Sequence, residues 1–322
     1  MITLPENNVL NKTIEYLQEV PFNVNPKQLY NANTLYDAMI ENPNASLEDC
    51  HDQKVYRHFI EKGKSARTEQ EQLARSLHDF SINKAMRRFL KKIDPLTVVG
   101  VMGGHQLKRT DASFKGIVLL SKKLTEMGTT MVSGGGPGAM EATHLGAWMA
   151  GRNEEEVEEA MQILRSAPSF KDNGWVNTAL EVMRRFPQTQ YRSLGIPTFL
   201  YGHEPSTPFA TDIAKFFINS VREDTILTVA YGGIIYTPGS AGTMQEVFQE
   251  AVQNHYLSFE LSSPMIFLGK EFWTEEQPVY PFLQNLMAKG KYKNLILSLT
   301  DSSEEVIDTL MKFRNSQGDK KN

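Results

Sequence analysis

The chain has 322 residues, of which 40% are hydrophobic and 22% are charged, and its formal net charge is −4. These values are typical of a globular protein with one large domain, or one core domain with an appendage. They exclude the basic surface of a dedicated nucleic-acid binder, and the single cysteine, Cys50, excludes an internal disulfide. The first residues lack a secretory-signal pattern, and no apolar run reaches the roughly 18 residues that span a bilayer. We therefore expect a cytoplasmic protein with neither a nucleic-acid nor a membrane partner.

The character of the chain changes near Asp94-Pro95. The part before it is charged and poor in glycine, and from Tyr56 to Lys92 its apolar residues recur at helical spacing. That spacing predicts two or three helices. We expect an N-terminal, mainly helical extension over residues 1–95 and a nucleotide-binding and catalytic domain over residues 96–322.

After Pro95, apolar runs of strand length alternate with glycine-containing turns and helical patterns. This alternation predicts an α/β fold with a Rossmann-like, doubly wound parallel sheet. A stretch at 151–195 interrupts the rhythm as an excursion with helices near 154–164 and 176–185. The predicted strands are 97–102, 129–133, 197–201, 233–237, 264–268 and 295–299. The predicted helices are 113–127, 139–150, 219–229, one ending near His255, one that includes 282–288, and 303–313.

Two glycine-rich turns follow predicted strands and open predicted helices: Ser133-Gly-Gly-Gly-Pro-Gly-Ala-Met140 and Pro238-Gly-Ser-Ala-Gly-Thr-Met-Gln-Glu246. A helix N-terminus carries unpaired N–H groups and partial positive charge, and glycine lets the backbone approach an anion closely. Neither turn has the lysine of an ATP-type loop, and the first is a poor match to a dinucleotide fingerprint. We interpret the pair as a phosphate cradle. The alternative is that the glycines only permit tight turns.

These two turns resemble the G-G-G-x-x-G-[LA]-M turn and the P-G-G-x-G-T-x-x-E signature of the LOG family, once labelled lysine decarboxylases. Arg222 precedes Pro238 by sixteen residues, which is similar to the spacing of that family's catalytic arginine. Gly103-Gly104-His105 resembles the first turn of the family's larger bacterial nucleotide 5′-monophosphate nucleosidases. The matches cover about residues 98–313, whereas the N-terminal helices and the excursion suit the larger bacterial group rather than a minimal plant-type member.

The resemblance implies hydrolysis of the N-glycosidic bond of nucleoside 5′-monophosphates, with release of a free base and ribose 5-phosphate. It implies Arg222 and Glu246 as catalytic residues, a homodimer or higher homo-oligomer, and neither a cofactor nor a metal. The substrate- and phosphate-binding residues that we carry over are Gly103, Gly104, His105, Ser133, Gly134, Gly135, Gly136, Gly138, Met140, Gly239, Ser240, Ala241, Gly242 and Thr243.

One residue departs from the signature, because Ser240 occupies the position of its second glycine. If that position needs a positive φ, serine costs about 1 kcal/mol there. This departure favours a different function, that of a non-catalytic nucleotide- or cofactor-binding or carrier protein on the same fold.

Several site residues also have structural alternatives. Thr243 and Glu246 have the spacing of a helix capping box. Arg222 alone could be a solvated helix charge or the partner of a neighbouring acid. His105 could serve a loop, and Met140 could pack within a helix.

Overall fold

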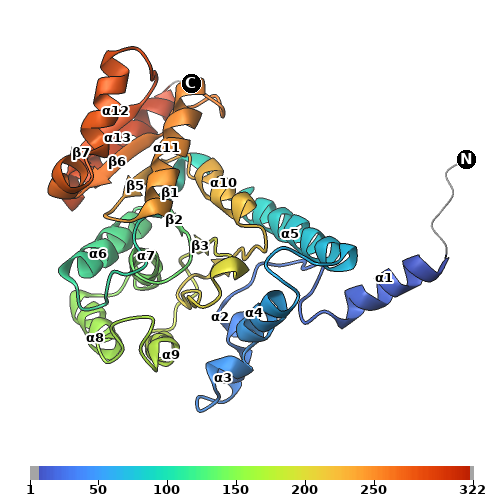
Figure 1. Ribbon diagram of the computed structural model, residues 1–322. Helices are drawn as coiled ribbons and strands as arrows, with labels where there is room; N and C mark the ends of the chain where they lie inside the picture. The colour runs from blue at the N-terminus through green and yellow to red at the C-terminus, as the bar shows by residue number, and fades with distance from the viewer. Residues whose placement is uncertain (1–6, 320–322) are drawn as a thin grey trace, which may run out of the picture.

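The computed structural model describes residues 7–319, and its centre is a seven-stranded sheet in which every neighbouring pair of strands is parallel (Figure 1). The strand order is β4-β3-β2-β1-β5-β6-β7. The predicted α/β, doubly wound fold is therefore confirmed. The strands are β1 (Val98–Met102), β2 (Thr130–Ser133), β3 (Ser193–Gly195), β4 (Asp212–Ile213), β5 (Gly233–Tyr236), β6 (Pro264–Leu268) and β7 (Ile296–Thr300).

Helices cover both faces of this sheet, and alternate strand residues face each side. In β1, Val99 and Val101 belong to a core cluster shared with α6, α7, α8 and α13, whereas Val98 and Met102 belong to one shared with α10, α11 and α12. The helices are α6 (Ala112–Glu126), α7 (Ala139–Trp148), α8 (Glu154–Leu164), α9 (Trp175–Arg185), α10 (Asn219–Val229), α11 (Ala241–Tyr256), α12 (Val279–Ala288) and α13 (Ser303–Asp319).

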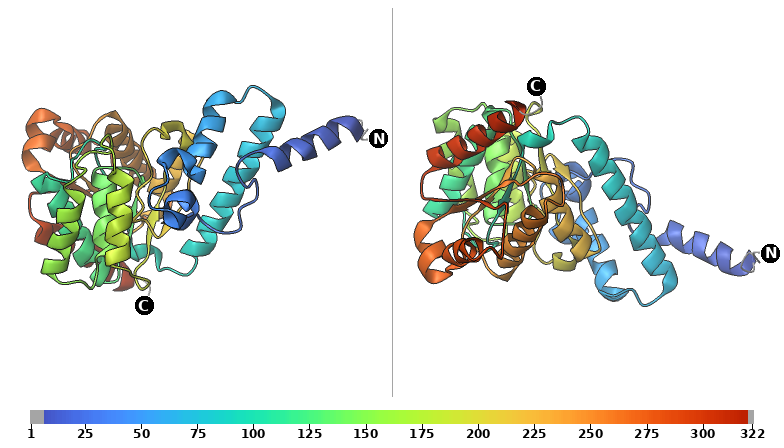
Figure 2. Two further views of the ribbon diagram at one scale, coloured as in Figure 1. Left: turned by 90° about the horizontal axis from the view of Figure 1, so that it is seen from below. Right: turned by 90° about the horizontal axis from the view of Figure 1, so that it is seen from above.

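The N-terminal part is helical, and α1 extends away from the sheet (Figure 2). Its later residues pack against the sheet, because Leu35, Tyr36 and Ile82 share a core cluster with strand residues of β1 and β5. The division at residue 95 stays a prediction. No helix in the described part of the chain combines the length and apolar character needed to cross a bilayer. The N-terminal helices are α1 (Asn7–Glu19), α2 (Ala32–Leu35), α3 (Asp37–Glu41), α4 (His51–Glu61) and α5 (Glu69–Leu90), and the short 3₁₀ helices η1 (Leu47–Asp49) and η2 (Pro95–Thr97) accompany them.

The strand predicted at 197–201 is wrong. The strand at this place is β3, which ends at Gly195, and Phe199–Tyr201 forms a short 3₁₀ helix, η3. The neighbouring strand β2 ends at Ser133, opposite Gly195, so residues beyond Ile196 have no β2 ladder to join. Thr198 then caps η3, because its hydroxyl accepts a hydrogen bond from the N–H of Leu200 at 3.1 Å.

The strand order reverses between β1 and β5. The chain builds the sheet outward from β1 to β4 on one side and then crosses to place β5 against the free edge of β1. In open α/β sheets, a ligand crevice forms at such a reversal, beyond the carboxyl ends of the strands. The three predicted glycine turns follow β1, β2 and β5, so all of them lie at this crevice.

Candidate functional site

The three glycine turns contact one another at the carboxyl ends of their strands. Gly104 donates its N–H to the carbonyl of Pro238 at 3.0 Å, and its own carbonyl accepts the N–H of Ala139 at 3.1 Å. The turn after β1 is therefore held between the other two. This arrangement brings residues 35 and 134 positions apart in the chain to one point of the sheet edge.

In the turn after β2, two glycines are required by the backbone conformation and by close neighbours. Gly138 has φ +70°, and a Cβ there would lie 2.8 Å from the carbonyl carbon of His105 and close to the carbonyl oxygen of Gly104. Gly135 has φ +69°, and a Cβ there would lie 2.9 Å from Pro197. The alternative that glycine permits tight turns thus describes these two positions well.

A cleft of about 290 Å³ opens at the meeting point of the turns. It contains both predicted catalytic residues and many of the predicted binding residues. Among the predicted residues, Ser133, Gly135, Gly136, Gly138, Gly239 and Ala241 lie outside its lining. The lining residues are Val101, Met102, Gly103, Gly104, His105, Gly134, Met140, Tyr201, Glu204, Arg222, Ser240, Gly242, Thr243 and Glu246.

Ser133 illustrates why some predicted residues lie behind the cleft. Its hydroxyl is within 2.8 Å of Nε2 of His144 and accepts the N–H of Gly135 at 3.1 Å. Both Ser133 and His144 are fully buried. Ser133 therefore stabilises the turn from the protein interior, whereas Gly134 and Met140 of the same turn line the cleft.

The N-terminus of α11 lies at the cleft and has no side-chain cap. The N-cap is Ser240, and no side chain of the described residues caps this end. The first N–H groups of a helix have no acceptor within it, and the helix dipole places positive charge there. Ser240, Gly242 and Thr243 line the cleft at this point, so the helix end is suited to an anion such as a phosphate.

The capping-box alternative for Thr243 and Glu246 is wrong. Because Ser240 is the N-cap, Thr243 is the third residue of α11 and Glu246 the sixth. A capping box needs its acidic residue at the third helical position. Glu246 is therefore free of that role and lines the cleft, with 8% of its surface exposed.

Ser240 fits its position without strain. Its φ is −110° and its ψ is −154°, which is extended backbone that any residue adopts. The departure from the family's glycine thus carries no conformational cost here. Its hydroxyl does not cap α11.

Arg222 and Glu246 lie next to each other in the cleft lining and come from adjacent helices. Nη1 of Arg222 lies 3.8 Å from Oε1 of Glu246, and their side chains are only 13% and 10% exposed. Nε of Arg222 donates to the carbonyl of Ile196 at 2.9 Å, which fixes the guanidinium. Glu223, the acid next to Arg222, instead binds Asn219 and Gln245. Arg222 is therefore neither a solvated charge nor the partner of its neighbours.

The burial of Glu246 changes its acidity. Burial raises the pKa of this carboxyl to about 7, although the nearby Arg222 guanidinium lowers it and Glu223 raises it further. Perturbed carboxyls in clefts are candidates for acid–base or charge-stabilising roles. Glu246 can thus change its protonation state near neutral pH.

One wall of the cleft comes from residues that the sequence prediction missed. Tyr201 and Glu204 follow β3, and Glu204 lies 3.8 Å from Nε2 of His105. The ring of His105 packs edge-on against Phe170, with 5.9 Å between centroids. His105 thus has both a loop contact and a place in the cleft. Tyr201 is the last residue of the strand predicted at 197–201, and the cluster of Tyr201, His203 and Glu204 is the signal in the sequence for this wall.

Two chemical elements therefore meet in the cleft, a helix end suited to an anion and a buried carboxylate held near an arginine. Among residues 7–319, no group of three or more His, Cys, Asp and Glu side chains is placed to hold a metal ion. The arrangement can position an anionic substrate and stabilise positive charge that develops on it.

No family model and no curated protein match this chain. Solved structures overlap with it in part. The X-ray structure of TM1055, a structural genomics target, is 18% identical with a TM-score of 0.44, and the overlap covers 67% of this chain and 98% of that one. The molybdenum cofactor binding protein from the phototrophic bacterium Rippkaea orientalis is 15% identical with a TM-score of 0.41, covering 67% and 96%. Values of this size carry no information on substrate or reaction, which must come from the cleft residues themselves.

Proposed function

We propose that this protein hydrolyses the N-glycosidic bond of nucleoside 5′-monophosphates and releases a free base and ribose 5-phosphate. The observation that carries the proposal is the buried Glu246, which lies 3.8 Å from Arg222 and on the same helix as the uncapped N-terminus at Ser240. Such a carboxylate can stabilise an oxocarbenium-like state, act as nucleophile or activate water.

The spacing along α11 suits this substrate. Thr243 and Glu246 are three residues apart on one helix, so their Cβ atoms are about 5–6 Å apart on the same face. A 5′-phosphate at the helix end would place the sugar beside Glu246. A fixed phosphate converts binding energy far from the reacting carbon into positioning. The wall of His105, Tyr201 and Glu204 would face the base.

Arg222 has two roles in this proposal. Its charge favours the ionised form of Glu246 against the effect of burial. Its hydrogen bond to Ile196 fixes the guanidinium, so that it can also contact phosphate or ribose without reorganising. Ser240, the feature that favours a non-catalytic binding protein, has an unstrained backbone, so the turn that it belongs to keeps its geometry.

The test is to incubate the protein with AMP, GMP, CMP, UMP and a cytokinin monophosphate and to measure free ribose 5-phosphate. We expect release from at least one of them, and none from the corresponding nucleosides, because the phosphate anchor is lost. Calorimetric binding of the same nucleotides is measured in parallel. Binding without any ribose 5-phosphate would contradict the enzyme proposal and support a carrier.

The pH dependence of kcat/KM should report Glu246. If the ionised carboxylate of Glu246 is the catalytically active form, kcat/KM rises as the pH increases through about 7, where Glu246 loses its proton. The profile is measured from pH 6.5 to 9, since the substrate's phosphate itself titrates near pH 6. A fall in kcat/KM over this range would show that Glu246 acts as a proton donor instead, against the role assigned here.

A further inference from the structure

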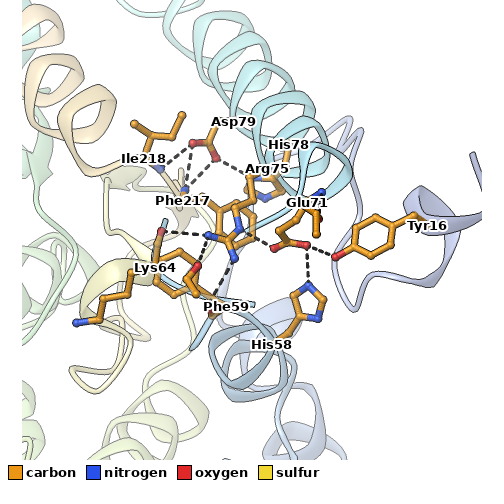
Figure 3. Close-up of polar contacts among 12 residues, drawn as sticks. Tyr16, His58, Phe59, Lys64, Glu71, Arg75, His78, Asp79, Phe217 and Ile218 are labelled. Atoms are coloured by element: carbon orange, nitrogen blue, oxygen red, sulfur yellow. Dashed lines mark hydrogen bonds and ion pairs between the residues drawn. The ribbon is translucent and has the colours of Figure 1, made fainter. Parts of the chain in front are cut away.

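Helix α10, which carries Arg222, starts without a cap of its own. Its N-cap residue is Ile218, whose side chain makes no capping hydrogen bond. Asp79 of α5 instead binds the backbone of the N-cap residue and of the residue before it (Figure 3). Its carboxylate accepts the N–H of Phe217 at 2.9 and 3.2 Å and the N–H of Ile218 at 2.9 Å. A carboxylate at a helix N-terminus also interacts favourably with the helix dipole.

Asp79 is itself held in place. It is only 5% exposed, and its Oδ1 lies 3.0 Å from Nδ1 of His78. The other ring nitrogen of His78 lies 2.9 Å from the hydroxyl of Tyr30, whose backbone exchanges two hydrogen bonds with Ile213 of β4. A chain of buried polar contacts thus runs from the sheet edge through Asp79 to the first turn of α10.

Phe217, which precedes the N-cap of α10, also contacts the segment that carries Tyr201. Phe217 packs on Phe22 of the N-terminal segment and stacks on Phe199, with 4.6 Å between centroids in both pairs. Phe199 opens η3, which carries Tyr201 into the cleft. The N-terminal part of the chain therefore contacts the elements that present Arg222 and Tyr201.

A second buried carboxylate on α5 gives an internal comparison. Glu71 accepts hydrogen bonds from Arg75 at 2.6 Å and from the hydroxyl of Tyr16 at 2.6 Å, and it lies 3.0 Å from His58 (Figure 3). These contacts join α1, α4 and α5, and the Glu71 carboxylate has no hydrogen bond to α10. Glu71 thus matches Asp79 in residue class, helix and burial but does not bind the backbone at the start of α10. Its partner Arg75 lies 5.6 Å from the ring centroid of Phe217, so Glu71→Gln, which keeps an acceptor for Arg75, is the matched change.

We propose that Asp79 is a positioning residue, which sets the start of α10 and thereby the placement of Arg222 against Glu246. Arg222 belongs to the first turn that Asp79 holds, since its N–H donates to the carbonyl of Ile218 at 3.3 Å. The inference rests on the proposed function for its catalytic consequence. It assigns the N-terminal helices a part in building the cleft.

The test compares Asp79→Ala and Asp79→Asn with Glu71→Gln, alone and combined with Arg222→Ala. Asp79→Asn keeps one acceptor oxygen, so it tests the contact in a protein that retains most of the native packing. We expect Asp79→Ala to lower kcat/KM by about tenfold to hundredfold and Asp79→Asn by less. In the Arg222→Ala background, neither Asp79 change should lower kcat/KM further, because the group that it positions is gone. Glu71→Gln should lower thermal stability and leave kcat/KM unchanged.

A second readout separates this inference from the proposed function. Hydrogen exchange of the amides at 219–222 should be faster in the Asp79 variants and unchanged in Glu71→Gln. The same double-mutant cycle is measured with the dissociation constant of AMP, so a protein that binds nucleotides without cutting them still tests Asp79. Additive effects of Asp79→Ala and Arg222→Ala, or unchanged exchange at 219–222, would overturn the positioning role.

Discussion

Replacing Glu246 by glutamine should lower kcat for ribose 5-phosphate release by about 10³-fold, within the range typical of a positioned acid–base group. Glutamine keeps the size of the side chain but cannot carry negative charge. The affinity for the nucleotide should change only a few fold, because we propose that the N-terminus of α11, and not the carboxylate, binds the phosphate. Single-turnover release of ribose 5-phosphate and calorimetric binding measure the two effects separately.

Glu250 is the matched control for this change. It lies one turn further along α11, is 3% exposed, and has a pKa that burial also raises to about 7. It accepts a hydrogen bond from Ser263 and does not line the cleft. Glu250→Gln should therefore leave kcat within a few fold of the wild type. Full turnover in Glu246→Gln, or equal losses in both variants, would contradict the catalytic assignment.

Replacing Gly138 by alanine should lower the free energy of unfolding by about 3–5 kcal/mol. The residue has φ +70° and ψ −130°, which alanine adopts only with strain, and the new Cβ would meet backbone atoms of Gly104 and His105. Backbone atoms cannot move aside as a flexible side chain does, so the turns after β1 and β2 would separate. Urea unfolding measures the loss, and weaker AMP binding should accompany it.

Gly116 provides the control for the alanine change. It lies inside α6, and a Cβ there meets no atom within 4 Å. Gly116→Ala should raise the stability by about 0.5–1 kcal/mol, because alanine restricts the unfolded chain and favours the helix. If Gly138→Ala unfolded at the wild-type urea concentration, the close contact between the two turns would not be needed.

Much of the architecture was predictable, because it depends on local patterns. The helices predicted at 154–164 and 219–229 and the strand at 264–268 have the predicted bounds in the structure. Gly128 ends α6 with φ +82°, as a helix C-terminal glycine does. The strand at 197–201 failed because its apolar residues pack in an aromatic cluster, a contact that local periodicity does not encode. The domain boundary, the homo-oligomer and the binding roles of individual residues stay predictions.

The sequence by itself indicated the alternation of strands, glycine turns and helices, although it missed β3 and β4. The family resemblance, and not the local sequence, implied Arg222 and Glu246 as catalytic residues. Turn residues, helix periodicity and the spacing between motifs are properties of short segments, so they can be seen without a fold. Only the tertiary structure decided that Ser240 is unstrained, that Ser240 rather than Thr243 occupies the N-cap position of α11 without a side-chain capping bond, and that burial raises the pKa of Glu246. It also decided that Asp79 holds Phe217, 138 positions away. These properties arise from contacts between distant segments, whose burial and distances exist only once the chain is folded.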